Sequence, residues 1–284
     1  MDKFMNLKIK PYIMLARPAN IALVTTVILI TSAFYSPYPP VWKVLLSILC
    51  VAFITAAGNT LNDLNDIEID RINKPKRPLP SGTVTPENAK RYMYLLFIFG
   101  NGFALILGFW NLLLSLLIVT PALYWYAKHL RNVPLAGNVM VAFLSSLTFI
   151  FAAAAFRDLG PAYIPALYCF MISLIREIVK DLEDLSGDGA NNSNTLPVAV
   201  GEASTRVIAA IMILFFLPMI PLPYLAGLYN KWFFFIAVFA GGVPMVVMMV
   251  RLFQVRKAVN YYQLASVMKI IMFIGLLALF IGRV

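Results

Sequence analysis

Apolar stretches of roughly 20 residues recur along almost the whole chain, and this repetition restricts the fold more than any other feature. A bilayer core of about 30 Å is crossed by a helix of about 20 residues, which satisfies its backbone hydrogen bonds without water. Of the 284 residues, 61% are hydrophobic and only 13% are charged, whereas soluble domains are about 25% charged. The sequence therefore predicts an all-α, polytopic membrane protein.

The stretches predict about nine transmembrane helices. We expect them at 17–36, 42–62, 91–109, 112–128, 136–156, 161–181, 204–225, 231–250 and 264–283. Polar residues inside these spans, such as Asn20, Asn101 and Ser145, are expected to bridge helices. Cys50 and Cys169 lie in apolar runs without metal-binding spacing, so we expect neither a disulfide nor a zinc site.

The basic residues indicate an orientation. With the N-terminus inside, 19 of the 23 lysines and arginines fall in cytoplasmic segments or helix ends, and only Lys43, Arg157, Lys231 and Arg283 fall outside. The positive-inside rule then predicts a multi-pass protein of the cell membrane with a cytoplasmic N-terminus and an external C-terminus. This topology explains the net charge of +10, and no nucleic-acid partner is expected because no basic module with base-stacking aromatics is present.

Two acidic clusters share the spacing D-x-x-D-x-x-x-D, and residues at i, i+3 and i+7 lie along one face of an α-helix. The first stripe is expected to contain Asp63, Asp66 and Asp70, and the second Asp181, Asp184 and Asp188. Like charges this close repel one another, so a cation is expected to hold them unless they are solvated or protonated. Solvated helix ends are the simpler explanation, but two identical spacings at one membrane face argue against it.

The residue types of these stripes favour Mg²⁺. Hard oxygen ligands without histidine or thiolate suit Mg²⁺ better than transition metals. Magnesium is usually bound by one or two carboxylates together with substrate phosphates, so the implied substrate is a diphosphate, held through two ions. The loop 71–82 mixes cations with prolines, and its Lys74 and Arg77 are candidates for contact with phosphate oxygens.

At these residues the sequence resembles the UbiA superfamily of intramembrane prenyltransferases. The signature N-D-x-x-D-x-x-x-D of that superfamily stands at 62–70, its basic R-P-L-P-S-G segment at 77–82, and its second aspartate motif at 181–188. Residues 17–20, 137–138 and 195–197, and Tyr124 with Lys128, also look like family positions. The resemblance therefore spans most of the chain.

The resemblance implies a single transmembrane domain, 1–284, with a nine-helix bundle around a central cavity and cytoplasmic cap loops at about 63–90 and 182–203. It implies that Asn62, Asp66 and Asp70 hold one Mg²⁺ and Asp184 and Asp188 a second, with Asp66, Asp70, Asp184 and Asp188 as catalytic residues. Asp63 and Asp181 would bind metal directly or support the ligands. The expected substrate contacts are Arg17, Asn20, Lys74, Arg77, Tyr124, Lys128 and Arg206. The only histidine, His129, is expected at the surface.

Within the superfamily, residues 70–75 and 176–181 look most like the archaeal branch that makes the second ether bond of archaeal membrane lipids. This implies an isoprenoid diphosphate donor, geranylgeranyl diphosphate, and a lipid-like phosphate acceptor, geranylgeranylglyceryl phosphate, handled among membrane lipids. The second anionic headgroup would need further cations, for which Arg17 and Arg206 are candidates. Enzymes that prenylate aromatic acids such as 4-hydroxybenzoate are an alternative. A cation-coupled transporter fits less well, because its carboxylates would lie near the midplane on interrupted helices.

Overall fold

The computed structural model describes residues 2–190, 193–254 and 258–283, with the side chains of 2–8, 72–73, 186–188, 190 and 258–259 outside the description. Most of the described residues form helices, which loops and turns connect. The only β feature among the described residues is an isolated antiparallel bridge between Tyr229 and Arg283. The all-α prediction is confirmed.

The chain divides into two compact units, the first made of Met1–His129 and Thr148–Leu159 and the second of Leu130–Leu147 and Gly160–Val284. The helices of the first unit are α1 (Asp2–Ala16), α2 (Pro18–Ser32), α3 (Val41–Asn65), α4 (Ile67–Asn73), α5 (Pro86–Leu107), α6 (Phe109–Leu112), α7 (Thr120–Trp125) and the π-helices η1 (Leu113–Val119) and η2 (Tyr126–Leu130). Helix α8 (Ala136–Phe156) belongs in part to each unit.

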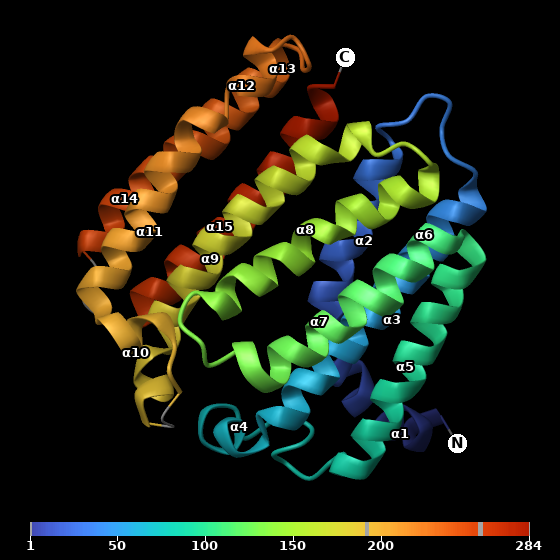
Figure 1. Cartoon of the computed structure of the whole chain (residues 1–284). Helices are drawn as coiled ribbons and strands as arrows, with labels where there is room; N and C mark the ends of the chain where they lie inside the picture. The colour runs from blue at the N-terminus through green and yellow to red at the C-terminus, as the bar shows by residue number, and fades with distance from the viewer. Residues whose placement is uncertain (1, 191–192, 255–257, 284) are drawn as a thin grey trace. The chain divides into compact units, whose positions relative to one another are not determined.

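The second unit continues from the first half of α8. Its further elements are α9 (Tyr163–Ala190), α10 (Leu196–Val200), α11 (Glu202–Phe216), α12 (Leu222–Leu225), α13 (Lys231–Phe235), α14 (Val243–Gln254), α15 (Ala258–Ile281), the π-helix η5 (Ile236–Gly242) and the 3₁₀ turns η3 (Gly160–Ala162) and η4 (Leu217–Met219). Helix α9 lies alongside α15 and α11 (Figure 1). Tyr168 of α9 donates a hydrogen bond to the carbonyl of Ile220, 3.2 Å away, where the chain turns after η4.

In the first unit, α5 lies alongside α3 (Figure 1) because a glycine permits a close approach. A Cβ atom built on Gly100 would lie 2.6 Å from Cγ1 of Ile54 and 3.3 Å from its backbone nitrogen. Thr85 caps the start of α5, where its hydroxyl accepts a hydrogen bond from the N–H of Asn88, and Pro86 occupies the first helical position, where no N–H is needed. The α3–α5 pair is the scaffold on which the first acidic motif stands.

Seven helical segments of the described residues are long and apolar enough to cross a membrane, or eight if the bent pair Ile9–Ala16 and Pro18–Ser32 counts as one span. The seven are Val41–Asn65, Phe109–Leu130, Ala136–Phe156, Gly160–Leu185, Glu202–Leu225, Lys231–Gln254 and Asn260–Ile281. The expected span 91–109 exists as α5, but Lys90, Arg91 and Asn101 lower its hydropathy. The chain is a multi-pass membrane protein, and the count of nine is not confirmed.

The four tryptophans lie near helix ends with exposed rings, as expected for residues at membrane–water interfaces. Trp42 and Trp232 each lie next to a lysine whose Nζ is 5.8 Å and 5.7 Å, respectively, from the ring centroid. Trp110 lies in α6, and Trp125 ends α7. These positions are consistent with helices that begin and end at the two surfaces of a bilayer.

Candidate active site

The first acidic motif forms the stripe that its spacing predicts. Helix α3 ends at Asn65, and Asp66 (φ −99°, ψ 5°) joins it to α4. The N–H of Asp66 still donates to Asn62, and that of Asp70 to Asp66, at 3.0 and 2.7 Å, so the helical repeat continues through the junction. Asp63, Asp66 and Asp70 are therefore buried together, with exposed fractions of 3, 7 and 4%, whereas Glu68 is exposed.

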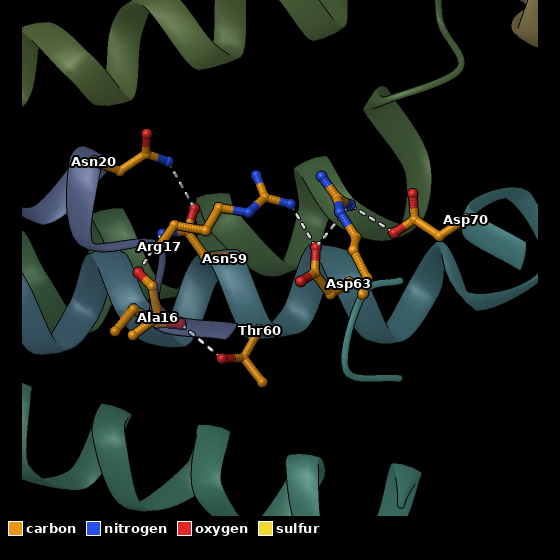
Figure 2. Close-up of polar contacts among 9 residues, drawn as sticks. Ala16, Arg17, Asn20, Asn59, Thr60, Asp63 and Asp70 are labelled. Carbon is orange, nitrogen blue, oxygen red and sulfur yellow. Dashed lines mark hydrogen bonds and ion pairs between the residues drawn. The ribbon is translucent and has the colours of Figure 1, made fainter. Parts of the chain in front are cut away.

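Two arginines form ion pairs with two of the three buried carboxylates (Figure 2). Arg17 and Arg77 both donate to Oδ1 of Asp63, Arg77 at 3.2 Å, and the same Nη1 of Arg77 is 2.5 Å from Oδ2 of Asp70. Buried carboxylates are unfavourable unless they are paired and hydrogen-bonded. The stripe is thus a charged, organised site, in which Arg17 comes from 46 residues upstream of Asp63.

The loop that carries Arg77 is anchored by a small apolar cluster. Leu79 and Val84 are buried against Leu15 and Ala89, with Tyr12 and Tyr92 packed edge to face at the margin of the cluster. Inside the loop, the carbonyl of Pro78 accepts hydrogen bonds from the Thr83 hydroxyl at 3.0 Å and from the N–H of Val84 at 3.1 Å. These contacts hold the guanidinium of Arg77 against the motif.

Arg17 stands at the break between α1 and α2, where the chain bends by 53°. Asn59, one helical turn before Asp63, donates to the carbonyl of Ala16 at 2.9 Å and accepts from Nδ2 of Asn20 at 3.2 Å. The expectation that Asn20 bridges helices is confirmed. Asn101 likewise donates to Thr120 at 3.3 Å, whereas the Ser145 hydroxyl donates within its own helix, to the carbonyl of Val141 at 2.8 Å.

The remaining expected contacts of the first unit lie at or near the surface. Nζ of Lys128 is 5.2 Å from the ring centroid of Tyr124, and α7 approaches α3 closely because a Cβ on Gly58 would lie 3.0 Å from Leu123. Lys74 is exposed at the end of α4. His129 is exposed, as expected for a surface residue, and its ring lies against Trp125 with centroids 4.7 Å apart and an angle of 41° between the ring planes.

The second acidic motif lies on the last turns of α9. Asn138 of α8 is buried and donates to Oδ2 of Asp181 at 2.8 Å. Asp184 is half-buried, and the side chain of Asp188 lies outside the described residues. Gly137 allows the turn before Asn138, because a Cβ there would lie 2.8 Å from the carbonyl oxygen of Leu130.

Arg206 is engaged with neighbours in the second unit. Its Nη2 forms an ion pair with Glu202, and its Nε donates to the hydroxyl of Tyr261 at 2.5 Å, which in turn donates to Glu202 at 2.6 Å. A buried Glu177 forms a further ion pair with Arg176 of α9. Arg206 and Arg17 are each paired with a carboxylate, but the side chain of Arg206 is 19% exposed and that of Arg17 is 31% exposed.

The residues of both motifs suit Mg²⁺ in ligand type, since their side chains offer oxygen donors. Among the described side chains, no group of three or more His, Cys, Asp or Glu converges in metal-binding geometry. In the first motif, the carboxylates of Asp63 and Asp70 instead form ion pairs with arginine side chains. Magnesium requires only one or two carboxylates when phosphates complete its shell, so the donor set fits the ion.

Sequence reasoning gave Asn59 no role in the site, and it marked Asn138 only as a family position without a partner. Both are neutral amides in largely apolar helices, and each lies one turn from, or bonded to, the first aspartate of a motif. The physical signal for both residues was the cost of burying an amide in a membrane helix without a partner. That signal indicates a bridging role but does not identify the partner.

Comparison with known proteins finds relatives over most of the chain. A digeranylgeranylglyceryl phosphate synthase of Methanobrevibacter smithii is 37% identical over 235 residues, covering 78% of this chain and 80% of that protein. A solved structure named for digeranylgeranylglyceryl phosphate synthase in membranes is 31% identical, with a TM-score of 0.80, covering 97% of this chain and 98% of the other.

A UbiA homologue from Archaeoglobus fulgidus bound to GPP and Mg²⁺ has a similar fold, with a TM-score of 0.58 at 18% identity over 95% of this chain and 99% of that one. The sequence model of the UbiA prenyltransferase family matches residues 22–277 of this chain. Because this match spans most of the chain, and the acidic motifs fall inside it, the chain belongs to the UbiA prenyltransferase family.

Proposed function

We propose that this chain catalyses Mg²⁺-dependent transfer of a geranylgeranyl group from geranylgeranyl diphosphate to geranylgeranylglyceryl phosphate, forming an ether bond of an archaeal membrane lipid. The observation that carries the proposal is the buried first motif, where three carboxylates lie beside Arg17 and Arg77. Similarity to two proteins named digeranylgeranylglyceryl phosphate synthase, over 78% and 97% of the chain, supports this choice of acceptor.

The proposed metal ligands come from both motifs. Asn62, Asp66 and Asp70 hold one Mg²⁺, and Asp184 and Asp188 hold a second. Oδ1 of Asp63 accepts from both Arg17 and Arg77, and Asp181 accepts from Asn138, so we assign these two mainly to orienting the site. Asp70, which accepts from Arg77 through Oδ2, stays in the proposed ligand set. The Mg²⁺ and GPP bound to the Archaeoglobus fulgidus homologue support both the ion and the diphosphate class.

The charge of the first motif suits a metal-bound diphosphate. Its three carboxylates and two guanidinium groups carry one formal negative charge in total, and one Mg²⁺ would convert this to one positive charge. A positively charged, partly buried site attracts phosphate oxygens more strongly than the same charges would in water. Arg77 binds the diphosphate in this scheme, with Lys74, Lys128 and Tyr124 at its margin.

The acceptor brings a second anionic headgroup, which needs a cation that the diphosphate does not use. We assign Arg17 to this phosphate, with Asn20 close to it, because Arg17 comes from the α1–α2 break and not from the loop that carries Arg77. Arg206 is a second candidate, whose ion pair with Glu202 would have to loosen for it to bind a phosphate.

The reaction breaks the allylic C–O bond of the donor. When bound, Mg²⁺ would neutralise the negative charge that builds on the departing diphosphate. The guanidinium group of Arg77 would donate hydrogen bonds to the diphosphate oxygens. The apolar helices exclude water from the allylic cation. The acceptor hydroxyl oxygen then bonds to the cationic carbon and passes its proton to the departing diphosphate or to a motif carboxylate, giving the ether and released diphosphate.

We further propose that the N-terminus and both motifs face the cytoplasm and that the C-terminus lies outside. The distribution of the basic residues supports this orientation, with 19 of 23 on the expected inner side.

The test compares acceptors in one assay of the purified protein with labelled geranylgeranyl diphosphate. The three acceptors compared are geranylgeranylglyceryl phosphate, its dephosphorylated alcohol and 4-hydroxybenzoate. Mass spectrometry identifies the products. We expect the phosphate to be preferred, and Arg17→Ala to raise its KM about tenfold or more, the loss expected for one charge-assisted hydrogen bond. Preference for the aromatic acid, or indifference to the phosphate, would refute the proposed acceptor.

A further inference from the structure

The break between α1 and α2 leaves a backbone carbonyl without its usual helical partner. In a continuous helix the carbonyl of Ala16 would accept from the N–H of residue 20, four positions later. Here the N–H of Asn20 instead bonds to the carbonyl of Arg17, at 2.9 Å. A buried carbonyl without a donor is costly, and Ala16 is only 7% exposed.

Asn59 supplies the missing donor. Its Nδ2 lies 2.9 Å from the oxygen of Ala16, and its Oδ1 accepts from Nδ2 of Asn20 at 3.2 Å. Because a carbonyl can only accept, the first bond fixes which way the carboxamide points. One buried side chain of α3 is thus bonded to residues on both sides of the break, before and after Arg17 (Figure 2).

Arg17 has a backbone conformation that an arginine adopts only at a cost. Its φ of 55° and ψ of 79° are left-handed, a region that costs non-glycine residues about 1–2 kcal/mol. Such an outlier persists when the surrounding structure determines it. Glycine would adopt this conformation without strain, so the presence of arginine points to a use for the guanidinium group, which binds Asp63.

We propose that Asn59 is a positioning residue for Arg17. Asn59 and Asp63 are four residues apart on one face of α3, so the amide fixes the break one turn from the carboxylate, and the side chain of Arg17 extends along α3 to Asp63 (Figure 2). Asn59 thereby presents the guanidinium group to the acceptor phosphate, and this consequence rests on the role of Arg17 in the proposed function.

The test is a double-mutant cycle of Asn59→Leu and Arg17→Ala, read as acceptor KM. Leucine keeps the size of the side chain but removes both hydrogen bonds. We expect Asn59→Leu to raise the KM for geranylgeranylglyceryl phosphate about fivefold to tenfold, with the donor KM changed less than about twofold, and to add nothing in the Arg17→Ala background. An equal effect of Asn59→Leu in both backgrounds would show a merely structural role and overturn the inference.

Thr60 provides a matched control. It is as buried as Asn59 and adjacent to it, but its hydroxyl bonds to Ala56 of its own helix, at 2.8 Å. Thr60→Val should leave acceptor KM within about twofold of wild type. A rise in acceptor KM as large as that of Asn59→Leu would contradict a specific role for Asn59.

Two further measurements cover other outcomes. If Asn59→Leu does not fold, Asn20→Ala removes one bond to Asn59 from an exposed position and should raise acceptor KM by a smaller factor that again vanishes with Arg17→Ala. If the wild-type protein transfers no prenyl group, the proposed function fails. The positioning role of Asn59 is then tested by the melting temperatures of the variants. Non-additive shifts for Asn59→Leu and Arg17→Ala would then support positioning, and additive shifts would refute it.

Discussion

Asp63 organises the first motif at the scale of single residues. Both of its arginine contacts use Oδ1, and its burial prevents water from replacing them. Removing one partner of a buried pair is far more costly than its net contribution suggests, because a buried charge is left behind. The arginines therefore maintain the carboxylates as well as serving substrate phosphates.

This arrangement makes a prediction for Arg77, whose side chain is 25% exposed and bonds to two carboxylates. Arg77→Met should lower the free energy of unfolding by about 1–3 kcal/mol, less than for a fully buried pair. Added Mg²⁺ should recover part of this loss, because the ion replaces the missing charge. Melting curves in detergent, with and without Mg²⁺, measure both effects.

The control for Arg77 is Arg71→Met, which removes an exposed pair with Glu68 at 2.8 Å. Exposed pairs contribute about 0–1 kcal/mol, so its melting temperature should hardly change. Equal destabilisation by the two substitutions, or no greater Mg²⁺ response in Arg77→Met than in wild type, would contradict the ion-pair account.

Sequence reasoning found the first acidic stripe because helical spacing alone places Asp63, Asp66 and Asp70 on one face. It selected Arg77 from its position in a basic, proline-rich loop. The pairing of Arg17 with Asp63 depends on a tertiary contact across 46 residues, which local periodicity does not encode. The partners of the Asn59 and Asn138 amides were not predicted for the same reason.

At the scale of elements, apolar length predicted where most helices lie, but their internal irregularities depend on packing. The expected span 112–128 contains η1 and part of η2, two π-helical segments. The expected span 17–36 begins at the α1–α2 break, where Pro18 and the left-handed Arg17 end one helix and begin the next. Pro18 was visible in the sequence, but the bend of 53° was not.

The α3–α5 contact provides a test of helix packing, using two glycines of α5. Gly100→Ala would place its Cβ 2.6 Å from Ile54, and overpacking of this kind costs about 1–3 kcal/mol. Gly102→Ala meets nothing within 4 Å and should be neutral or stabilise by up to about 1 kcal/mol, because alanine favours the helix. Thermal melting of both variants in detergent gives the comparison, and equal melting temperatures would refute the proposed tight packing.

At the scale of the whole molecule, the predicted orientation in the membrane depends on basic residues along the entire chain and not on a single motif. In a background without Cys50 and Cys169, single cysteines would replace the exposed residues Lys76 and Lys231. A membrane-impermeant maleimide applied to intact cells should label position 231 and leave position 76 unlabelled until the cells are opened. Labelling of position 76 from outside would reverse the assignment.

The central claim is that both acidic motifs act on a Mg²⁺-bound prenyl diphosphate. The most direct measurement is turnover of labelled geranylgeranyl diphosphate by wild type, Asp66→Ala and Asp184→Ala, each with Mg²⁺ and with EDTA, and with Glu68→Gln as the control at an exposed acid. We predict that EDTA abolishes turnover, that each aspartate variant loses at least about a hundredfold, as when a main transition-state stabiliser is removed, and that Glu68→Gln retains activity. Near-normal turnover in EDTA, or in either aspartate variant, would contradict the claim.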